Sequence, residues 1–214
     1  MSKECKYFHD LCNKIQKQRF PFDINKIPMN GIYILFENGE LAHSTYRIVR
    51  IGINKNDNNL QKRIMEHFIT ENKDRSIFRK NIGRALLNKN KDNYIKAWDI
   101  DFTYKKNKEL YKDIMNIKKQ NEIEKKVTEI IQNNFSFIEL REDNKEKRLL
   151  LESKIISTVS LCNECIQSEK WLGNYSPKDK IKKSGLWQIN ELYKTPLNEN
   201  EIEFLNLKVN KIMK

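Results

Sequence analysis

The sequence predicts a mixed α/β (α+β) domain. Two runs of β-forming residues, near 31–37 and 46–53, lie on either side of turn residues, which is typical of a hairpin. Several other segments carry apolar residues at helical spacing, and a short β-rich run follows at 135–140. At 214 residues the chain is long enough to bury its own core. These observations favour one α/β domain with additions.

The first half of the chain begins with apolar residues at helical spacing over 3–18, before Pro21 and Pro28 break the pattern. The predicted hairpin follows, with Asn38-Gly39 as its turn. A polar loop leads to a helix at about 59–70, and Ser76 is a plausible N-cap for the next helix. We therefore expect an N-terminal helical extension over 1–28, outside the main unit.

Residues 90–134 differ in composition, because Lys, Asn and Glu dominate there. Leu110, Ile114 and Ile117, and later Ile123 and Val127, recur at helical spacing, which predicts a helical insertion with one buried side and one Lys-rich side. Two interpretations stay open for it, a packing helix with a solvated face and a DNA-contacting arm.

The last third of the chain contains the β-rich run at 135–140, expected to be a third strand, and then a helix at about 144–159. After it, glycines and prolines predict ordered loop with short helical pieces. Trp171 and Trp187 are expected to anchor this tail to the body; stacking on nucleic-acid bases is the alternative. A C-terminal helical tail is expected over 193–214.

The charge balance favours a polyanionic partner. Lys and Arg number 41 against 29 Asp and Glu, a net charge of +12, which fits nucleic acid or simply a basic surface. No segment approaches a membrane span, and the polar start lacks the apolar core of a signal peptide. We therefore expect a cytoplasmic protein with no membrane association.

The four cysteines do not suggest a disulfide framework in a chain of this length. Cys162 and Cys165 have the spacing of a metal-binding pair, but no second such pair and no histidine pair completes four ligands. The sequence therefore does not predict structural zinc.

Two helices carry residues suited to chemistry. On the helix at 59–70, Arg63 and His67 are four residues apart at the edge of the apolar stripe, where both can reach one phosphate; a surface Arg beside a partly buried His is the alternative. On the helix at 144–159, Leu149, Ile155 and neighbouring apolar residues share a face with Glu152. A carboxylate on such a face needs a cation, either an Arg or Lys or a divalent metal.

These residues fall into an ordered set: Gly31-Ile32-Tyr33, then Arg50-Ile51-Gly52, then Arg63 and His67, and finally Glu152. The set resembles the signature of the GIY-YIG nuclease superfamily, in its restriction- or homing-type endonuclease branch, over a domain of residues 29–192. The resemblance implies a small three-stranded antiparallel sheet flanked by helices. It also implies phosphodiester hydrolysis with one divalent ion, usually Mg²⁺, with Mn²⁺ as the substitute.

The resemblance implies a role for each matching residue. Tyr33 would deprotonate or orient the attacking water, Glu152 would hold the metal, and Arg63 would offset charge on the phosphate. His67 would orient Tyr33 or assist proton transfer. Asn174 is the first choice for the polar residue that completes the site, with Asn190 as its competitor.

One residue departs from the signature, because position 50 is Arg where the second signature Tyr is expected. Either Arg50 contacts the phosphate, or the protein is an inactive nuclease fold. The other residues expected to bind nucleic acid are basic ones in the loops and tail: Lys55, Lys62, Lys178, Lys182 and Lys183.

Three functions remain open on the sequence. The first is a metal-dependent DNA endonuclease of restriction type, which would act as a homodimer because one site cuts one strand at a time. The second is an inactive nucleic-acid-binding module with the same fold. The third is a small basic protein that binds protein partners through the segment 104–132; the salt dependence of binding separates it from the others.

Overall fold

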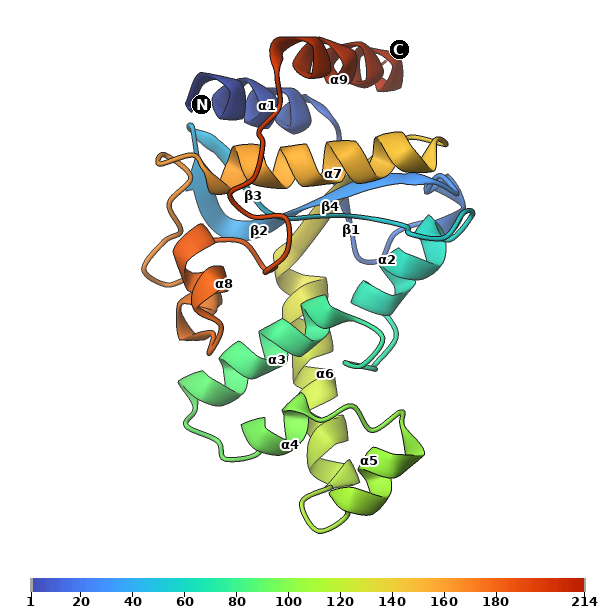
Figure 1. Cartoon of the computed structure of the whole chain (residues 1–214), viewed down its shortest axis with the longest axis vertical. Coiled ribbons are helices and arrows are strands. Elements are labelled where there is room, and N and C mark those ends of the chain that lie inside the picture. Colours follow the sequence, from blue (N-terminus) through green and yellow to red (C-terminus); the bar gives the residue numbers. More distant parts are fainter. Residues whose placement is uncertain (1, 214) are drawn as a thin grey trace.

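The computed structural model describes residues 2–213, and it is a mixed α/β fold as the sequence predicts (Figure 1). Its antiparallel sheet has the strand order β1-β4-β2-β3. The strands are β1 Gln18–Arg19, β2 Gly31–Ala42, β3 Thr45–Ile53 and β4 Phe135–Arg141. The fourth strand, which the sequence does not predict, is β1: it pairs only two residues with β4, too few to leave a periodic pattern.

The hairpin of β2 and β3 turns later than predicted. Asn38 and Gly39 lie within β2, beside an irregularity in its pairing with β3, and Gly39 has φ +83°. The turn is formed instead by His43 and Ser44, which both have positive φ. The prediction of an Asn38-Gly39 turn was therefore wrong, because the glycine accommodates a bulge and the strand continues past it.

Alternation along the strands gives the sheet two apolar faces. Ile32, Ile34 and Phe36 of β2 face one cluster, and Tyr33 and Leu35 face the other. The helices on the first face are α1 Ser2–Lys14, α7 Lys145–Ser160 and α9 Glu199–Ile212, with α9 lying against α1 (Figure 1). Those on the second are α2 Leu60–Phe68, α3 Ile77–Lys89 and α6 Ile117–Asn134.

Side-chain caps fix the start of two of the helices that line the cleft described below. Ser76 accepts a hydrogen bond from the Arg79 amide at the start of α3, as the sequence predicts, and Asn144 accepts one from the Lys147 amide at the start of α7. Short helices complete the chain: α4 Ile95–Asp99, α5 Lys105–Leu110 and α8 Asp179–Ser184, with 3₁₀ turns at Ile24–Lys26 and Leu172–Tyr175 (η2).

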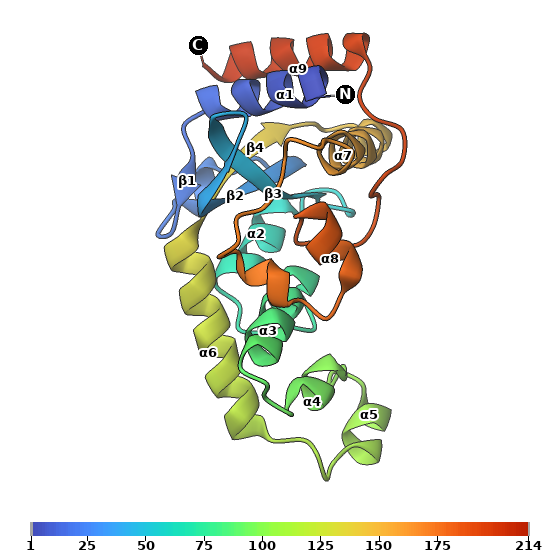
Figure 2. The same cartoon turned by 90° about the vertical axis from the view of Figure 1, so that its left-hand side faces the viewer.

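The segment 104–132 is not one helix, because residues 111–116 separate α5 from α6. Ile123, Val127 and Ile131 of α6 are buried as expected. Leu110, Ile114 and Ile117 are exposed, which corrects the expectation that they belong to the buried side. Figures 1 and 2 show α4, α5 and the lower half of α6 projecting away from the sheet.

No helix among residues 2–213 is both long and apolar enough to cross a membrane.

Candidate active site

One cleft of about 780 Å³ opens between the β2–β3 hairpin, α2, α3, α7 and the segment 188–191. Its walls contain several site residues that the sequence predicts, together with polar residues that the sequence does not predict. The charged and polar residues lining the cleft are Tyr33, Arg50, Asn54, Lys55, Asn56, Asn59, Arg63, Glu66, Asn81, Glu152, Gln188, Asn190 and Glu191. Five segments of the chain therefore contribute to a single polar site.

Tyr33 lies near the start of β2 and is 1% exposed. Its position opposite Gly52 in β3 explains the glycine, because a Cβ at Gly52 would lie 2.3 Å from the Tyr33 hydroxyl oxygen. The tyrosine ring thus lies against the neighbouring strand, where any larger residue would displace it.

His67 lies behind Tyr33 and does not line the cleft. Its Nε2 is 2.8 Å from the Tyr33 hydroxyl oxygen, and its Nδ1 is 2.7 Å from Oγ of Ser76. The His67 side chain is fully buried, so the expectation from the sequence that it lies at the edge of the apolar stripe of α2 was wrong. Hydrogen bonds therefore connect Tyr33, His67 and the α3 cap in one line.

The buried imidazole of His67 is neutral. Burial, followed by the positive charges of Arg63 and Arg50, lowers the pKa of His67 well below its ordinary value. A neutral imidazole has one donor and one acceptor nitrogen, so His67 can accept from Tyr33 while donating to Ser76, or the reverse.

Arg63 lines the cleft from α2, with about a quarter of its side chain exposed. One guanidinium nitrogen bonds to the Glu66 carboxylate at 3.1 Å and to the Arg75 carbonyl oxygen at 2.8 Å. Burial alone would lower the pKa of Arg63, but the neighbouring Tyr33 and Glu66 outweigh it and raise the pKa. The guanidinium is therefore a fixed positive charge beside Tyr33.

Glu152 lines the cleft from α7 and, within residues 2–213, accepts no hydrogen bond and forms no ion pair shorter than 4.0 Å. Burial raises the pKa of its carboxyl to about 7, although the positive charges of Arg50 and Lys55 partly oppose this rise. Of the two partners that the sequence left open, a structural Arg or Lys is not found in direct contact with Glu152 among residues 2–213. Leu149, which was expected on the buried face of this helix, is 42% exposed.

Arg50, in place of the second signature Tyr, is 5% exposed and lines the cleft from β3. Its Nη1 donates to the Trp187 carbonyl oxygen at 2.5 Å, and its guanidinium carbon lies 5.3 Å from the centre of the Phe78 ring. Its Nε is buried without a partner among the described residues. Arg50 is thus a fixed cation within the cleft, with hydrogen-bonding capacity left over.

The tail after α7 forms one wall of the cleft and is held by two tryptophans. The indole nitrogens of Trp171 and Trp187 donate to the same Glu37 oxygen at 2.8 and 2.9 Å, and both rings are buried. This confirms that they anchor the tail to the body. Because Trp187 is fixed, the following residues up to Asn190 are directed into the cleft.

The structure separates the two asparagines between which the sequence could not decide. Asn190 lines the cleft, whereas the Asn174 side chain donates to the carbonyl oxygens of Ser168 and Glu169 in the loop before η2. The geometry therefore favours Asn190. The preference for Asn174 rested on its sequence surroundings, and these do not determine how the tail folds back.

The predicted nucleic-acid-binding lysines lie in three places. Lys55 lines the cleft. Lys62 is exposed on α2 outside the cleft lining, and Lys182 and Lys183 lie on α8, at whose start Lys178 is the cap residue. The α8 lysines are separate from the cleft lining, and Lys182 pairs with Asp179 at 2.8 Å.

Asn81 is a cleft residue that sequence reasoning missed. It is 1% exposed, its oxygen accepts from Arg84, and its Nδ2 has no partner among the described residues. The sequence does contain a signal for this residue, because Asn81 is a polar side chain on the buried face of α3. A buried amide without a hydrogen-bond partner is costly, so such a residue suggests a functional position.

The loop 54–59 is held at the mouth of the cleft by an asparagine network. Asn54 Oδ1 accepts from the Gly31 amide, and its Nδ2 donates to Asn30 at 2.7 Å. The Asp57 carboxylate pairs with Arg148 of α7 at 2.6 Å. Lys55 is therefore presented from a loop fixed at both ends.

Comparison with known proteins gives one match. A family model described as the GIY-YIG domain matches residues 5–214, nearly the whole chain. Neither the curated proteins nor the solved structures contain a match. A family match of this extent agrees with the order of Tyr33, Arg63 and Glu152 along the chain and with their meeting in one cleft. The chain therefore belongs to the GIY-YIG family, whose members are nucleases.

Proposed function

We propose that the protein is a divalent-metal-dependent DNA endonuclease that hydrolyses phosphodiester bonds in the cleft of Tyr33 and Glu152. The observation that carries the proposal is the content of this cleft: a tyrosine backed by a neutral histidine, an unpaired carboxylate, and three cations. Binding alone does not require an unpaired carboxylate in a cleft that also receives a polyanion.

The residues present fit a Mg²⁺ or Mn²⁺ ion. Mg²⁺ takes oxygen ligands and is commonly held by one or two carboxylates together with substrate phosphates. Glu152 supplies such a carboxylate, and no donor among residues 2–213 bonds to it, so its oxygens are available to an ion. Because Arg50, Lys55 and Arg63 surround it, we expect an ion to bind chiefly together with the DNA phosphate.

A divalent ion held by Glu152 would supply positive charge to the scissile phosphate and acidify the attacking water. The protein's own part begins at Tyr33, whose hydroxyl oxygen would accept the proton of that water. As it does so, Tyr33 would pass its own proton to Nε2 of His67, 2.8 Å away. His67 is neutral, and in the tautomer whose Nδ1 donates to the Ser76 hydroxyl oxygen its Nε2 would be free to accept this proton.

The three cations would act on the phosphate. Arg63 presents a planar guanidinium next to Tyr33, where negative charge develops as the water attacks. Arg50 and Lys55 would bind phosphate oxygens of the same strand, and Arg50 would thereby take the place of the second signature Tyr. Asn190 would complete the site from the tail.

More specifically, we propose that the protein cleaves DNA at a specific sequence, as a restriction enzyme does, and acts as a homodimer. The exposed lysines of α5 and α6, on the part of the chain that projects from the sheet, support a role for it in DNA contact (Figure 1). An inactive DNA-binding module remains the alternative, favoured by the single observation that Arg50 stands where a tyrosine is expected.

The test is digestion of long unmodified phage DNA at low salt, with and without Mg²⁺, by wild type and Glu152→Ala. The proposal expects Mg²⁺-dependent bands from wild type alone, with both proteins retaining DNA in a salt-sensitive gel shift in EDTA. If wild type binds DNA in this way and leaves it uncut with Mg²⁺ or Mn²⁺, the binding module is the correct function.

A further inference from the structure

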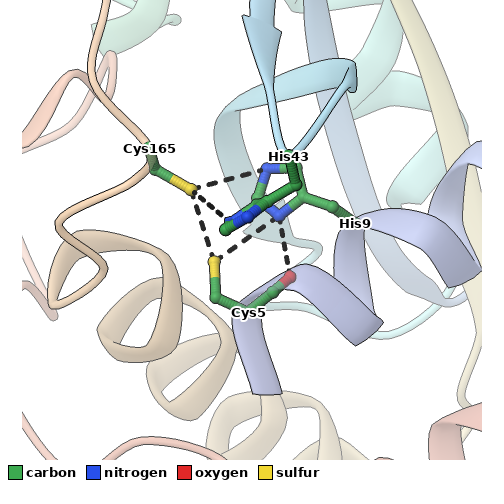
Figure 3. Close-up of side chains that lie close together, drawn as sticks. All are labelled: Cys5, His9, His43 and Cys165. Carbon is green, nitrogen blue, oxygen red and sulfur yellow. Dashed lines mark hydrogen bonds between the residues drawn. The ribbon is translucent and has the colours of Figure 1, made fainter. Parts of the chain in front are cut away.

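Two cysteines and two histidines form a cluster outside the catalytic cleft (Figure 3). Cys5 and His9 lie one turn apart on α1, His43 lies in the β2–β3 turn, and Cys165 lies in the loop after α7. Their ligand atoms all lie within 4.8 Å of one another. Cys162 is not among the four, so the predicted Cys162–Cys165 pair does not bind as a unit; the partners of Cys165 come from segments distant in sequence, which spacing along the chain does not reveal.

The spacing of these atoms matches a tetrahedral site. Bonds of about 2.3 Å to sulfur and about 2.0 Å to nitrogen put tetrahedral ligand atoms about 3.3 to 3.8 Å apart. The Sγ atoms of Cys5 and Cys165 are 3.4 Å apart, and Cys165 Sγ is 3.4 Å from Nε2 of His43 and 3.9 Å from Nε2 of His9. One small ion can therefore contact all four after minor adjustment.

In each histidine the other ring nitrogen lies near an oxygen atom, the kind of neighbour that metal-binding histidines generally have. Nδ1 of His43 lies 3.2 Å from the Glu164 carboxylate, near enough for an ion pair but without the geometry of a hydrogen bond, and Nδ1 of His9 lies 3.0 Å from the Cys5 carbonyl oxygen. Both arrangements make Nε2 the ligand. The Ile48 amide also approaches Nε2 of His9, at 3.2 Å, so the ion would replace this hydrogen bond.

The cluster is withdrawn from solvent. Cys5 and His9 are 0% exposed, Cys165 is 4% exposed, and the His43 side chain is 0% exposed although its residue forms a hairpin turn. Two thiolates would balance the charge of one divalent ion and leave the buried site neutral, which a low-dielectric interior requires. Mixed sulfur and imidazole ligands in tetrahedral array select Zn²⁺ rather than Mg²⁺.

We propose that Cys5, His9, His43 and Cys165 bind a structural zinc ion, distinct from the ion of the catalytic cleft. It would join the N-terminal helix α1, the tip of the hairpin and the loop that leads into the tail. Because that tail carries Trp171, Trp187 and Asn190, the zinc would hold one wall of the cleft in place without contacting the substrate.

The experiment is a metal analysis of the full-length protein, expressed with added zinc and purified without chelators. Wild type should contain one zinc per chain, and Cys165→Ser and His43→Asn should fall to background. The matched controls are Cys12→Ser, another buried thiol of α1, and Cys162→Ser, whose Sγ lies 3.5 Å from Nε2 of His43 but outside the proposed ligands. Both should keep the zinc.

A second measurement on wild type is independent of whether the ligand variants fold. Replacement of zinc by Co²⁺ should produce thiolate-to-cobalt charge-transfer bands and the visible bands of a tetrahedral site. Removal of zinc by a strong chelator should lower the melting temperature, and Zn²⁺ but not Mg²⁺ should restore it. A folded wild type that carries no zinc and takes up no Co²⁺, or that contains a Cys5–Cys165 disulfide, overturns the proposal. Loss of zinc in Cys12→Ser or Cys162→Ser overturns the ligand assignment.

Discussion

Replacing Glu152 with glutamine should abolish cleavage and, at the same time, make the protein more stable at alkaline pH. The carboxyl is poorly solvated and has no hydrogen-bond or ion-pair partner in the described part of the chain, and burial raises its pKa from 4.5 to about 7. A group whose pKa is higher in the folded state stabilises the fold fully only below its unfolded pKa. This contribution is lost as pH rises through the folded pKa. Glutamine resembles the protonated acid and has no such dependence.

The pKa difference sets the size of the effect. At about 1.36 kcal/mol per pH unit, raising the pKa from 4.5 to about 7 corresponds to about 3 kcal/mol at pH 8. At pH 5 the same difference gives less than about 1 kcal/mol. For a chain of this size, the melting temperature of Glu152→Gln should exceed that of wild type by roughly 5 to 10 °C at pH 8, and by little at pH 5.

The assay is thermal unfolding followed by circular dichroism at both pH values, in EDTA. Glu191→Gln is the matched control, because Glu191 lines the same cleft while its hydrogen bond from Lys194 lowers its pKa. That variant should gain no stability at pH 8. If Glu152→Gln is less stable than wild type at pH 8, Glu152 is a paired structural carboxylate and the argument for a metal ligand fails.

Three further predictions concern the reaction itself. Gly52→Ala should reduce plasmid cleavage about 100-fold with a normal circular dichroism spectrum, because the new Cβ displaces the Tyr33 hydroxyl; unchanged activity would show that this position of Tyr33 is not required. Arg63→Ala should lower the single-turnover rate by about 10²- to 10³-fold, and Arg63→Lys should recover only part of it because the planar fork is lost; full recovery would contradict a guanidinium-specific role. The cleavage rate at limiting Mg²⁺ should rise with pH through about 7, as the Glu152 carboxyl loses its proton; a rate that falls over this range would assign the titration to another group.

The local sequence pattern was sufficient to predict features that depend only on residues within one helix or strand. The periodicity of α2 placed Arg63 beside the buried stripe, and Ser76 was identified as an N-cap because capping depends on neighbouring residues. The strand position of Tyr33 followed from β-forming residues on either side. These features depend on interactions within a few residues, which a single sequence reveals.

Long-range placement could not be predicted in the same way. Whether Asn174 or Asn190 enters the cleft depends on Trp171 and Trp187 sharing the Glu37 carboxylate, a contact across more than 130 residues. The Cys/His cluster likewise assembles only when α1, the hairpin turn and the loop after α7 come together. Spacing along the chain carries no signal for such contacts.

Leu149 of α7 shows a further limit of hydrophobic periodicity as a predictor of burial. Leu149 and Glu152 are three residues apart and were assigned to one buried face, yet Leu149 is 42% exposed where it lines the cleft. An apolar residue at the rim of a functional cleft has the same pattern as a core residue. Only the packing of neighbouring elements distinguishes the two.

The central claim is that Tyr33 acts chemically in a metal-dependent nuclease centre, and the most direct test is plasmid cleavage by Tyr33→Phe in Mg²⁺. The substitution removes one hydroxyl and keeps the ring against Gly52. Tyr193→Phe, at an exposed position in the tail, is the control. The account predicts wild-type cleavage in the control and a loss of about 10²- to 10⁴-fold in Tyr33→Phe, the range of a general base. Equal cleavage rates in all three proteins would contradict it.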